Sequence, residues 1–229
     1  GLVHLRGMTN LEELILSGTE LTDAGLVHLK GLTKLQKLIL ELTKITNSGL
    51  VHLKGLTDLE SLDLTSCRIT DAGLVHLKEL TNLQKLFLYK TEVTDAGLVH
   101  LRELTKLTIL NPPHSITDSG LVHLKGLTNL RSLKIRGTKV TAEGIADLQK
   151  SLPNCKIYRK SPSSRSSTAR PRENRSRAAT RSAGSEAEPK GLTQERTETP
   201  TDVPSDSSSD DAVAALKKGF PGASIKQDD

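Results

Sequence analysis

Aromatic residues and cysteine are scarce in this chain of 229 residues, which has no Trp, two Phe, two Tyr and two Cys. Aromatic side chains bring the largest buried areas, so a core without them has to be built from aliphatic residues. Two cysteines exclude a disulfide-stapled secreted fold. No run of the sequence approaches the roughly 20 apolar residues of a transmembrane helix. The net charge of +5 is too modest to indicate a partner.

Composition divides the chain after residue 160. Residues 1–160 carry the whole net charge, whereas acidic and basic residues balance in 161–229. Few aliphatic residues occur in 161–211, where a basic block (165–181) precedes an acidic block (186–211). Such a segment cannot bury enough apolar surface to offset its ordering entropy. We therefore expect a folded domain at 1–160, a disordered Ser/Arg/Glu-rich linker at 161–211, and a short helix with a tail at 212–229.

A repeat of 24 residues organises the first part. The pentapeptide Gly-Leu-Val-His-Leu occurs at 1–5, 25–29, 49–53, 73–77, 97–101 and 120–124, and a degenerate copy follows at 144–148. One full copy reads Leu59-x-x-Leu62-x-Leu64-x-x-Cys67-x-Ile69, then Thr70-Asp71-Ala72-Gly73-Leu74. This period and frame resemble the leucine-rich repeat family. The Thr-Asp-Ala-Gly-Leu signature looks most like bacterial members, and is similar to the ribonuclease-inhibitor and F-box-associated types.

The resemblance implies an α/β solenoid with a parallel β-sheet on the concave face and helices on the convex face. The residue types agree with it. Leu62 and Leu64 alternate as in a half-buried strand. Cys67, which is Thr in other copies, suits a turn whose backbone groups need a hydrogen-bonding side chain. Asp71 and its equivalents are good helix N-caps. Stacked copies would share one leucine core.

Two helix-then-strand patterns are expected at the end of the chain. A helix from Ala142 to about Lys150, followed by a short parallel strand near Ile157, should close the core. Residues 212–225 read like a second copy of this cap, and the sequence does not say where it docks.

One copy is one residue short, and it carries Pro112 and Pro113 in its strand region. Since Pro cannot donate to a sheet ladder, we predict a local break or bulge in the concave sheet there. Two readings stay open for this copy, namely neutral drift in a tolerant loop and the shaping of a binding surface.

The convex face carries a column of His beside a column of basic residues. Metal ligation requires nitrogen atoms about 2.0–2.1 Å from one ion, whereas packed helices lie about 8–10 Å apart. We therefore expect no metal and no cofactor, and interpret the His column as a repeated outer-face residue or a weakly proton-sensitive surface. The basic column could follow an anionic polymer. Interleaved acids and the absence of aromatic residues make nucleic acid the less favoured partner.

The sequence does not indicate catalytic activity, because Gly-x-Ser-x-Gly, Walker A, His-Glu-x-x-His and Cys-x-x-Cys motifs are all absent from it. We predict that the chain is not an enzyme and that it has no catalytic residues.

The predicted partner-binding residues lie on the concave face: Ile15, Lys37, Ile39, Asp63, Lys85, Phe87, Tyr89, Lys134 and Arg136. Apolar side chains among charges resemble an interface core with a polar rim. Six strands cover on the order of 500 Å², below the ~800 Å² per partner of a standard interface.

The predicted function is a non-catalytic, monomeric scaffold that binds another protein or a peptide. The alternative is a regulatory or targeting fragment of a larger protein, whose basic Ser/Arg-rich tail contacts nucleic acid or an anionic surface. A third reading is an enzyme whose catalytic domain precedes residue 1. Because Gly1 starts in the middle of a repeat, we expect the natural N-terminus to be missing. The compartment is therefore undecided, with the cytoplasm slightly favoured.

Overall fold

The computed structural model describes residues 2–159 and 209–227. The segment expected to be disordered lies outside these ranges except at its end, where residues 209–211 are helical. The expected boundary at 212 was therefore three residues late. Acidic residues are favoured in the first turn of a helix, and Asp211 belongs to that turn.

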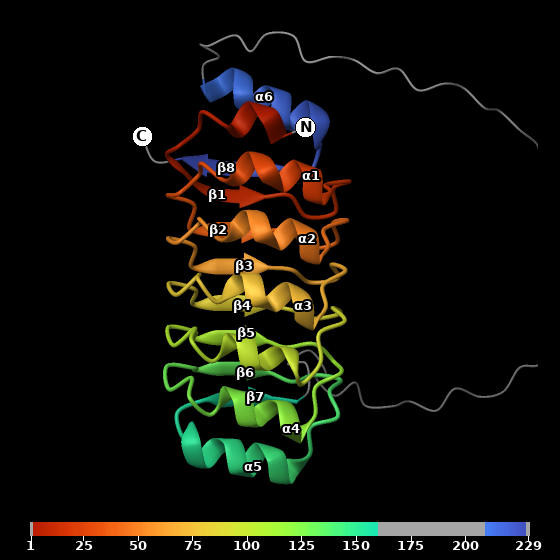
Figure 1. Ribbon diagram of the computed structural model, residues 1–229, viewed down its shortest axis with the longest axis vertical. Coiled ribbons are helices and arrows are strands. Elements are labelled where there is room, and N and C mark those ends of the chain that lie inside the picture. The colour runs from red at the N-terminus through yellow and green to blue at the C-terminus, as the bar shows by residue number, and fades with distance from the viewer. Residues whose placement is uncertain (1, 160–208, 228–229) are drawn as a thin grey trace, which may run out of the picture. The chain divides into compact units, whose positions relative to one another are not determined.

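The strands form one sheet (Figure 1). Its order is β7-β6-β5-β4-β3-β2-β1-β8, and strands β1 to β7 run parallel, with β8 antiparallel to β1. The strands are β1 (Leu11–Ile15), β2 (Lys37–Ile39), β3 (Ser61–Asp63), β4 (Lys85–Phe87), β5 (Ile109–Asn111), β6 (Ser132–Lys134), β7 (Lys156–Tyr158) and β8 (Ser224–Gln227).

A layer of short helices covers one face of this sheet (Figure 1). Most repeats contribute one α-helical turn that continues as a 3₁₀-helix. The α-helices are α1 (Asp23–Leu26), α2 (Asn47–Leu50), α3 (Asp71–Leu74), α4 (Asp118–Leu121), α5 (Ala142–Ser151) and α6 (Ser209–Gly219). The 3₁₀-helices are η1 (Leu2–Leu5), η2 (Val27–Leu29), η3 (Val51–Leu53), η4 (Val75–Leu77), η5 (Gly97–Leu101) and η6 (Val122–Leu124).

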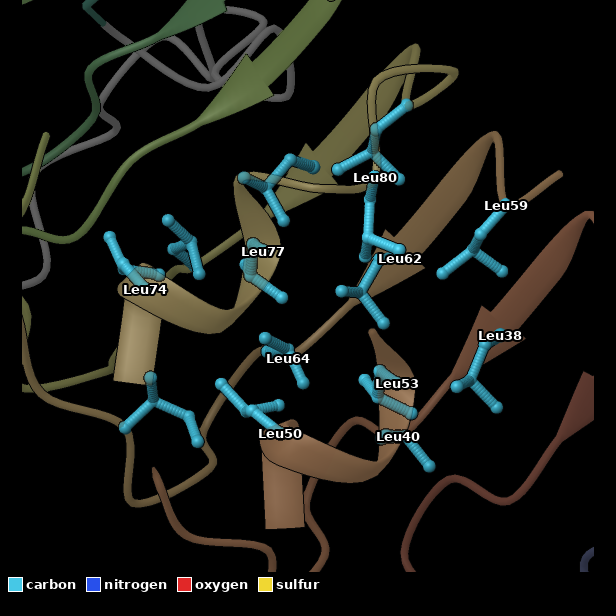
Figure 2. Packing of buried hydrophobic residues seen from close by; sticks show 14 of the residues in the cluster. Leu38, Leu40, Leu50, Leu53, Leu59, Leu62, Leu64, Leu74, Leu77 and Leu80 are labelled. Atoms are coloured by element: carbon cyan, nitrogen blue, oxygen red, sulfur yellow. The ribbon is translucent and has the colours of Figure 1, made fainter. Parts of the chain in front are cut away.

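Leucines from the strands and the helices fill the space between the two layers. Figure 2 shows Leu62 and Leu64 of one repeat pointing toward Leu74 and Leu77 of its helix. All four are fully buried, and so are the leucines at the same positions in the neighbouring repeats. Burying one such side chain stabilises the fold by about 1.5–3 kcal/mol. The repeated leucines therefore form one continuous core, as the predicted solenoid requires.

A hydrogen-bonding side chain lies in the turn after β1, β2, β3, β4 and β6, at the frame position of Cys67. In the Thr copies, the hydroxyl donates to a carbonyl three residues earlier, as Thr43 Oγ1 does to Leu40 O at 2.7 Å. Cys67 Sγ instead donates to Leu40 O of the preceding repeat at 3.1 Å. These contacts satisfy buried backbone acceptors, which confirms the role predicted for this position.

The recurring Asp is not the helix N-cap, and that prediction was wrong. Thr70, with an extended backbone, is the N-cap of α3, and Asp71 is the first helical residue. Its carboxylate accepts hydrogen bonds from the next repeat, from Thr94 N at 2.7 Å and from Thr94 Oγ1 at 2.6 Å. The same link joins Asp23 to Thr46, Asp95 to Thr117 and Asp118 to Thr141. At Asn47 the side-chain oxygen accepts from Thr70 N, while the side-chain nitrogen donates to Thr70 Oγ1. Stacking of the repeats therefore places the backbone N–H and the hydroxyl of a Thr of the next repeat at the Asp side chain. The N-cap position of the Asp's own helix is occupied by Thr70.

The shortened copy shows no bulge in the strand itself. β5 pairs with β4 over three residues in regular register, while its ladder with β6 has two pairs. The interruption comes after the strand. In regular copies, the backbone N–H of the residue just after the strand donates to the next strand, as Leu64 N does to Phe87 O. Pro112 occupies this position in the shortened copy and has no N–H. Regular copies also turn through a residue with positive φ, such as Ser66 at 60°, and the shortened copy has none. Pro113 cannot adopt that conformation, since its ring holds φ near −65°.

Candidate functional site

The face of the sheet that points away from the helices, called the open face below, carries the predicted site residues in two rows. Strand register aligns the first row across the sheet, namely Glu13, Lys37, Ser61, Lys85, Ile109, Ser132 and Lys156. It aligns the second row as Ile15, Ile39, Asp63, Phe87 and Asn111, with Lys134 beside Tyr158 on the last two strands. Tyr89 and Arg136 lie two residues beyond the second row.

Apolar side chains lie mainly in the second row. Ile15 and Ile39 are register partners on β1 and β2, and adjacent strands are about 4.8 Å apart. Both are half-buried, as are Phe87 and Tyr89. Lys90 Nζ lies 5.8 Å from the centre of the Tyr89 ring, within cation–π range. These apolar groups are thus partly covered by their neighbours and still reach solvent.

Charge is unevenly distributed along the open face. At the N-terminal end, Lys37 Nζ pairs with Glu13 Oε2 at 3.1 Å, and Asp63 Oδ1 accepts from Thr65 N at 2.8 Å. At the other end, Lys134, Arg136 and Lys156 are exposed. Within residues 2–159 and 209–227, no ion pair neutralises these three cations. The C-terminal end of the open face is therefore positively charged.

Sequence reasoning missed Asn111, Lys156 and Tyr158, although the same frame predicts them. Asn111 follows Phe87 by one repeat, but the expected break in β5 hid it. Tyr158 was assigned to the closing cap, whereas β7 pairs with β6 in the same register and extends the face by one strand. Tyr158 is 40% exposed, so it adds a third aromatic side chain to the open face, at its basic end.

Two members of the His column on the helix layer accept hydrogen bonds from arginines of the basic column, whereas Nδ1 of His52 and of His76 is buried without a partner in the described ranges of the chain. Arg6 Nε donates to His28 Nδ1 at 3.0 Å, and Arg102 Nη2 donates to His123 Nδ1 at 2.6 Å. Burial, and next the charge of Arg6, lower the pKa of His28. Burial, and next the charge of Lys54, lower the pKa of His76. The rings of His28 and His76 therefore stay neutral at neutral pH. Among the described residues, no group of three or more His, Cys, Asp or Glu side chains could hold a metal ion.

The basic column beside it is partly neutralised. Lys54 pairs with Glu79 at 3.8 Å, and Lys125 pairs with Asp147 at 2.6 Å.

Both cysteines are buried, and burial raises the pKa of Cys67 and raises that of Cys155 to about 11. A buried thiol with a raised pKa is a poor nucleophile. In the part of the chain that the structure describes, no helix has the length and apolar character needed to span a bilayer.

Comparison with known proteins agrees with this architecture. Two leucine-rich repeat family models match, one over residues 9–69 and one over residues 126–148. A search of curated proteins gives no match.

Among solved structures, the chain is similar to an internalin C2 of Listeria monocytogenes, with 31% identity, a TM-score of 0.56, and coverage of 69% of this chain and 66% of that one. It is also similar to an internalin (inlF) of the same organism, with 26% identity, a TM-score of 0.57, and coverage of 67% and 42%. A leucine-rich repeat protein of Leptospira interrogans, at 22% identity, a TM-score of 0.50, and coverage of 67% and 38%, shares the fold. The chain thus spans less than two thirds of the length of each. It is a leucine-rich repeat protein, related to the bacterial internalin-type proteins.

Proposed function

We propose that this chain is a non-catalytic module that binds another protein or a peptide on the open face of its sheet. Leucine-rich repeat domains typically bind proteins, and their fold is generally non-catalytic. We also propose that its repeats form a bacterial class marked by Thr-Asp-Ala-Gly-Leu, with the ribonuclease-inhibitor and F-box-associated repeats as relatives.

The observation that carries this proposal is the second row of the open face. Ile15, Ile39 and Phe87 are aligned by the sheet and half-buried. A rigid, partly apolar row loses little conformational entropy on binding, which favours its use as an interface core. Tyr and Phe are also among the residues enriched at interfaces.

The charges around this row favour one orientation of the partner. Glu13 and Asp63 lie toward β1, while Lys134, Arg136 and Lys156 lie toward β7. A partner whose acidic groups meet the β7 end would associate faster, and like charges would disfavour the reversed orientation. We therefore expect an apolar or aromatic anchor flanked by acidic residues in the bound segment.

Area sets a limit on the affinity. Counting β7 and β8 adds two strand spacings of about 4.8 Å each to the expected sheet, so the open face stays below the ~800 Å² per partner of a standard interface. Binding by this face alone is expected to be weak and transient unless the flanking turns contribute.

The test is the double substitution Phe87→Ala/Tyr89→Ala in the full chain. Partners are captured by crosslinking in an extract of the source cells and compared with those of the wild type. The matched control is Val51→Ala/Val122→Ala, which shortens two side chains of the helix layer that are 40% and 52% exposed. We expect the control to keep the partner and the double variant to lose it, with the same melting temperature in both. An unchanged partner set in a folded Phe87→Ala/Tyr89→Ala chain would exclude this surface.

The alternative role in nucleic-acid or anionic-surface contact depends on the basic block at 165–181, which lies outside the described residues. A salt titration separates the two proposals, because phosphate contacts are strongest at low salt. If the full chain binds no nucleic acid at low salt, the alternative is removed.

A further inference from the structure

The helix–strand unit at the end of the chain, α6 with β8, packs on the opposite end of the solenoid from β7. β8 pairs with β1 through Leu14 and Ile225 and through Ile15 and Ser224, and Figure 1 shows α6 beside η1. Leu216 is 1% exposed and belongs to the same buried cluster as the leucines of η1. The unit thus packs against the buried leucines of η1 and pairs with the edge of β1 that faces away from β2.

The sequence of this unit repeats that of the C-terminal cap, α5 with β7. In both copies a buried Leu is followed four residues later by an apolar residue and then by Pro, as Leu148-x-x-x-Leu152-Pro153 and as Leu216-x-x-x-Phe220-Pro221. The backbone agrees, because Leu152 N donates to Leu148 O at 2.9 Å and Phe220 N donates to Leu216 O at 2.8 Å. Next come a small buried residue and a half-buried Ile, which are Cys155 and Ile157 in one copy, Ala223 and Ile225 in the other. The chain therefore carries two copies of one cap.

The two copies differ in strand direction, and geometry explains the difference. β7 is parallel to β6, whereas β8 is antiparallel to β1. A unit that turns the same apolar face toward the opposite end of a stack has to be rotated by a half turn. When the rotation axis runs from the sheet to the helix layer, the helix stays in its layer and the strand reverses. The antiparallel pairing is what reuse of the same face requires.

We propose that the side of the first described repeat formed by β1 and η1 is a docking site for helix–strand units of this kind, which α6–β8 fills reversibly, so that a second copy of the chain can supply its own unit. Residues 159–208 join β7 to α6, and about 50 residues extend to at most roughly 160–180 Å. That length exceeds the roughly 34 Å along the sheet, so it permits docking within one chain or between two. Exchange of an identical element between copies is a known route to dimers.

Chain length also sets how often exchange occurs. A connection of about 50 residues gives an effective concentration on the order of 1 mM. At about 0.1 mM protein, roughly one end site in ten would then hold the unit of another copy. The chain is accordingly expected to be monomeric when dilute and partly dimeric when concentrated.

The test compares two full-length variants that place the same residue on different faces of α6. Leu216→Asp buries a charge in the docked unit, while Ala214→Asp puts the same charge at an exposed position. Hydrogen exchange is followed at the amides of β1 and, as an internal reference for the fold, of β6. We expect Leu216→Asp to raise exchange in β1 at least tenfold and to leave β6 unchanged. Ala214→Asp should match the wild type at both strands.

A labelled peptide of residues 207–229 then measures docking from outside. We expect it to bind the Leu216→Asp chain at least tenfold more tightly than the wild type, whose own unit competes, and to restore the protection of β1. A peptide that carries Leu216→Asp should bind neither chain. Unchanged β1 exchange in the Leu216→Asp chain, or failure of the wild-type peptide to bind it, would overturn the proposal.

Discussion

The glycine of the Thr-Asp-Ala-Gly-Leu signature has a packing role that a single substitution can measure. A Cβ atom added at Gly97 would overlap the Asp71 carboxylate of the preceding repeat and press on Val93 Cγ1 at 3.0 Å. The equivalent clash with the preceding Asp or Asn recurs at Gly49, Gly73, Gly120 and Gly144. The glycine therefore makes room for the carboxylate that links one coil to the next.

The magnitude follows from two opposing terms. Replacing Gly by Ala at a compatible position stabilises a protein by about 0.4–1 kcal/mol, through the entropy of the unfolded chain. Overpacking by one carbon typically destabilises by about 1–3 kcal/mol. Relief of the clash would require the carboxylate to move, which breaks the hydrogen bonds that Thr94 donates to it. Gly97→Ala should therefore lower the free energy of unfolding by about 1–2 kcal/mol.

Urea unfolding of Gly97→Ala, Asp71→Ala and the double variant separates these terms. With Ala at 71 the carboxylate is gone and only the contact with Val93 Cγ1 at 3.0 Å remains, so Gly97→Ala should be close to neutral in that background. A double-mutant cycle then gives the coupling between the two sites. Gly126→Ala is the control, because no atom lies within 4 Å of an added Cβ there. The reasoning is refuted if Gly97→Ala stabilises the wild type, or destabilises it equally with Ala at 71.

Three further outcomes are expected. Hydrogen bonds from the side chain and the backbone N–H of Thr141 lower the pKa of Asp118, so its stabilising effect is complete above the ordinary carboxyl pKa near 4 and is lost as the pH falls through the lower folded value. Asp118→Asn should accordingly lose less thermal stability than the wild type between pH 5 and pH 2, and parallel melting curves would contradict this. At pH 8 a thiol reagent should label Cys67 and Cys155 only after unfolding, because both are buried and the pKa of Cys155 is raised to about 11; fast labelling of the folded chain would show an open core. Leu62→Ala should lower the free energy of unfolding in urea by about 2–5 kcal/mol, since Leu62 is fully buried, and a smaller loss would mean that the neighbouring coils relax around it.

Much of the open face was predictable because the period is so regular. Residues that share a frame position occupy the same place in every coil, so Ile15 and Ile39 could be aligned without a structure. The degree of exposure was not predictable, since it depends on the neighbouring side chains. Asn111 was missed because the prolines after it suggested a broken strand. The strand survives, since Pro112 removes a hydrogen bond only beyond its end.

By itself, the sequence determined the repeat length, the leucine core, the direction of strands β1 to β7 and the closing role of α5 with β7. These features depend on periodicity and on short-range pattern. Only the tertiary structure decided which groups meet across coils. Asp71 looked like a local cap, but stacking brings Thr94 to it, and the same carboxylate accounts for Gly97. The docking of α6 with β8 on β1 joins segments about 200 residues apart, and no local rule names a partner at that distance, since such contacts form only once the chain has folded.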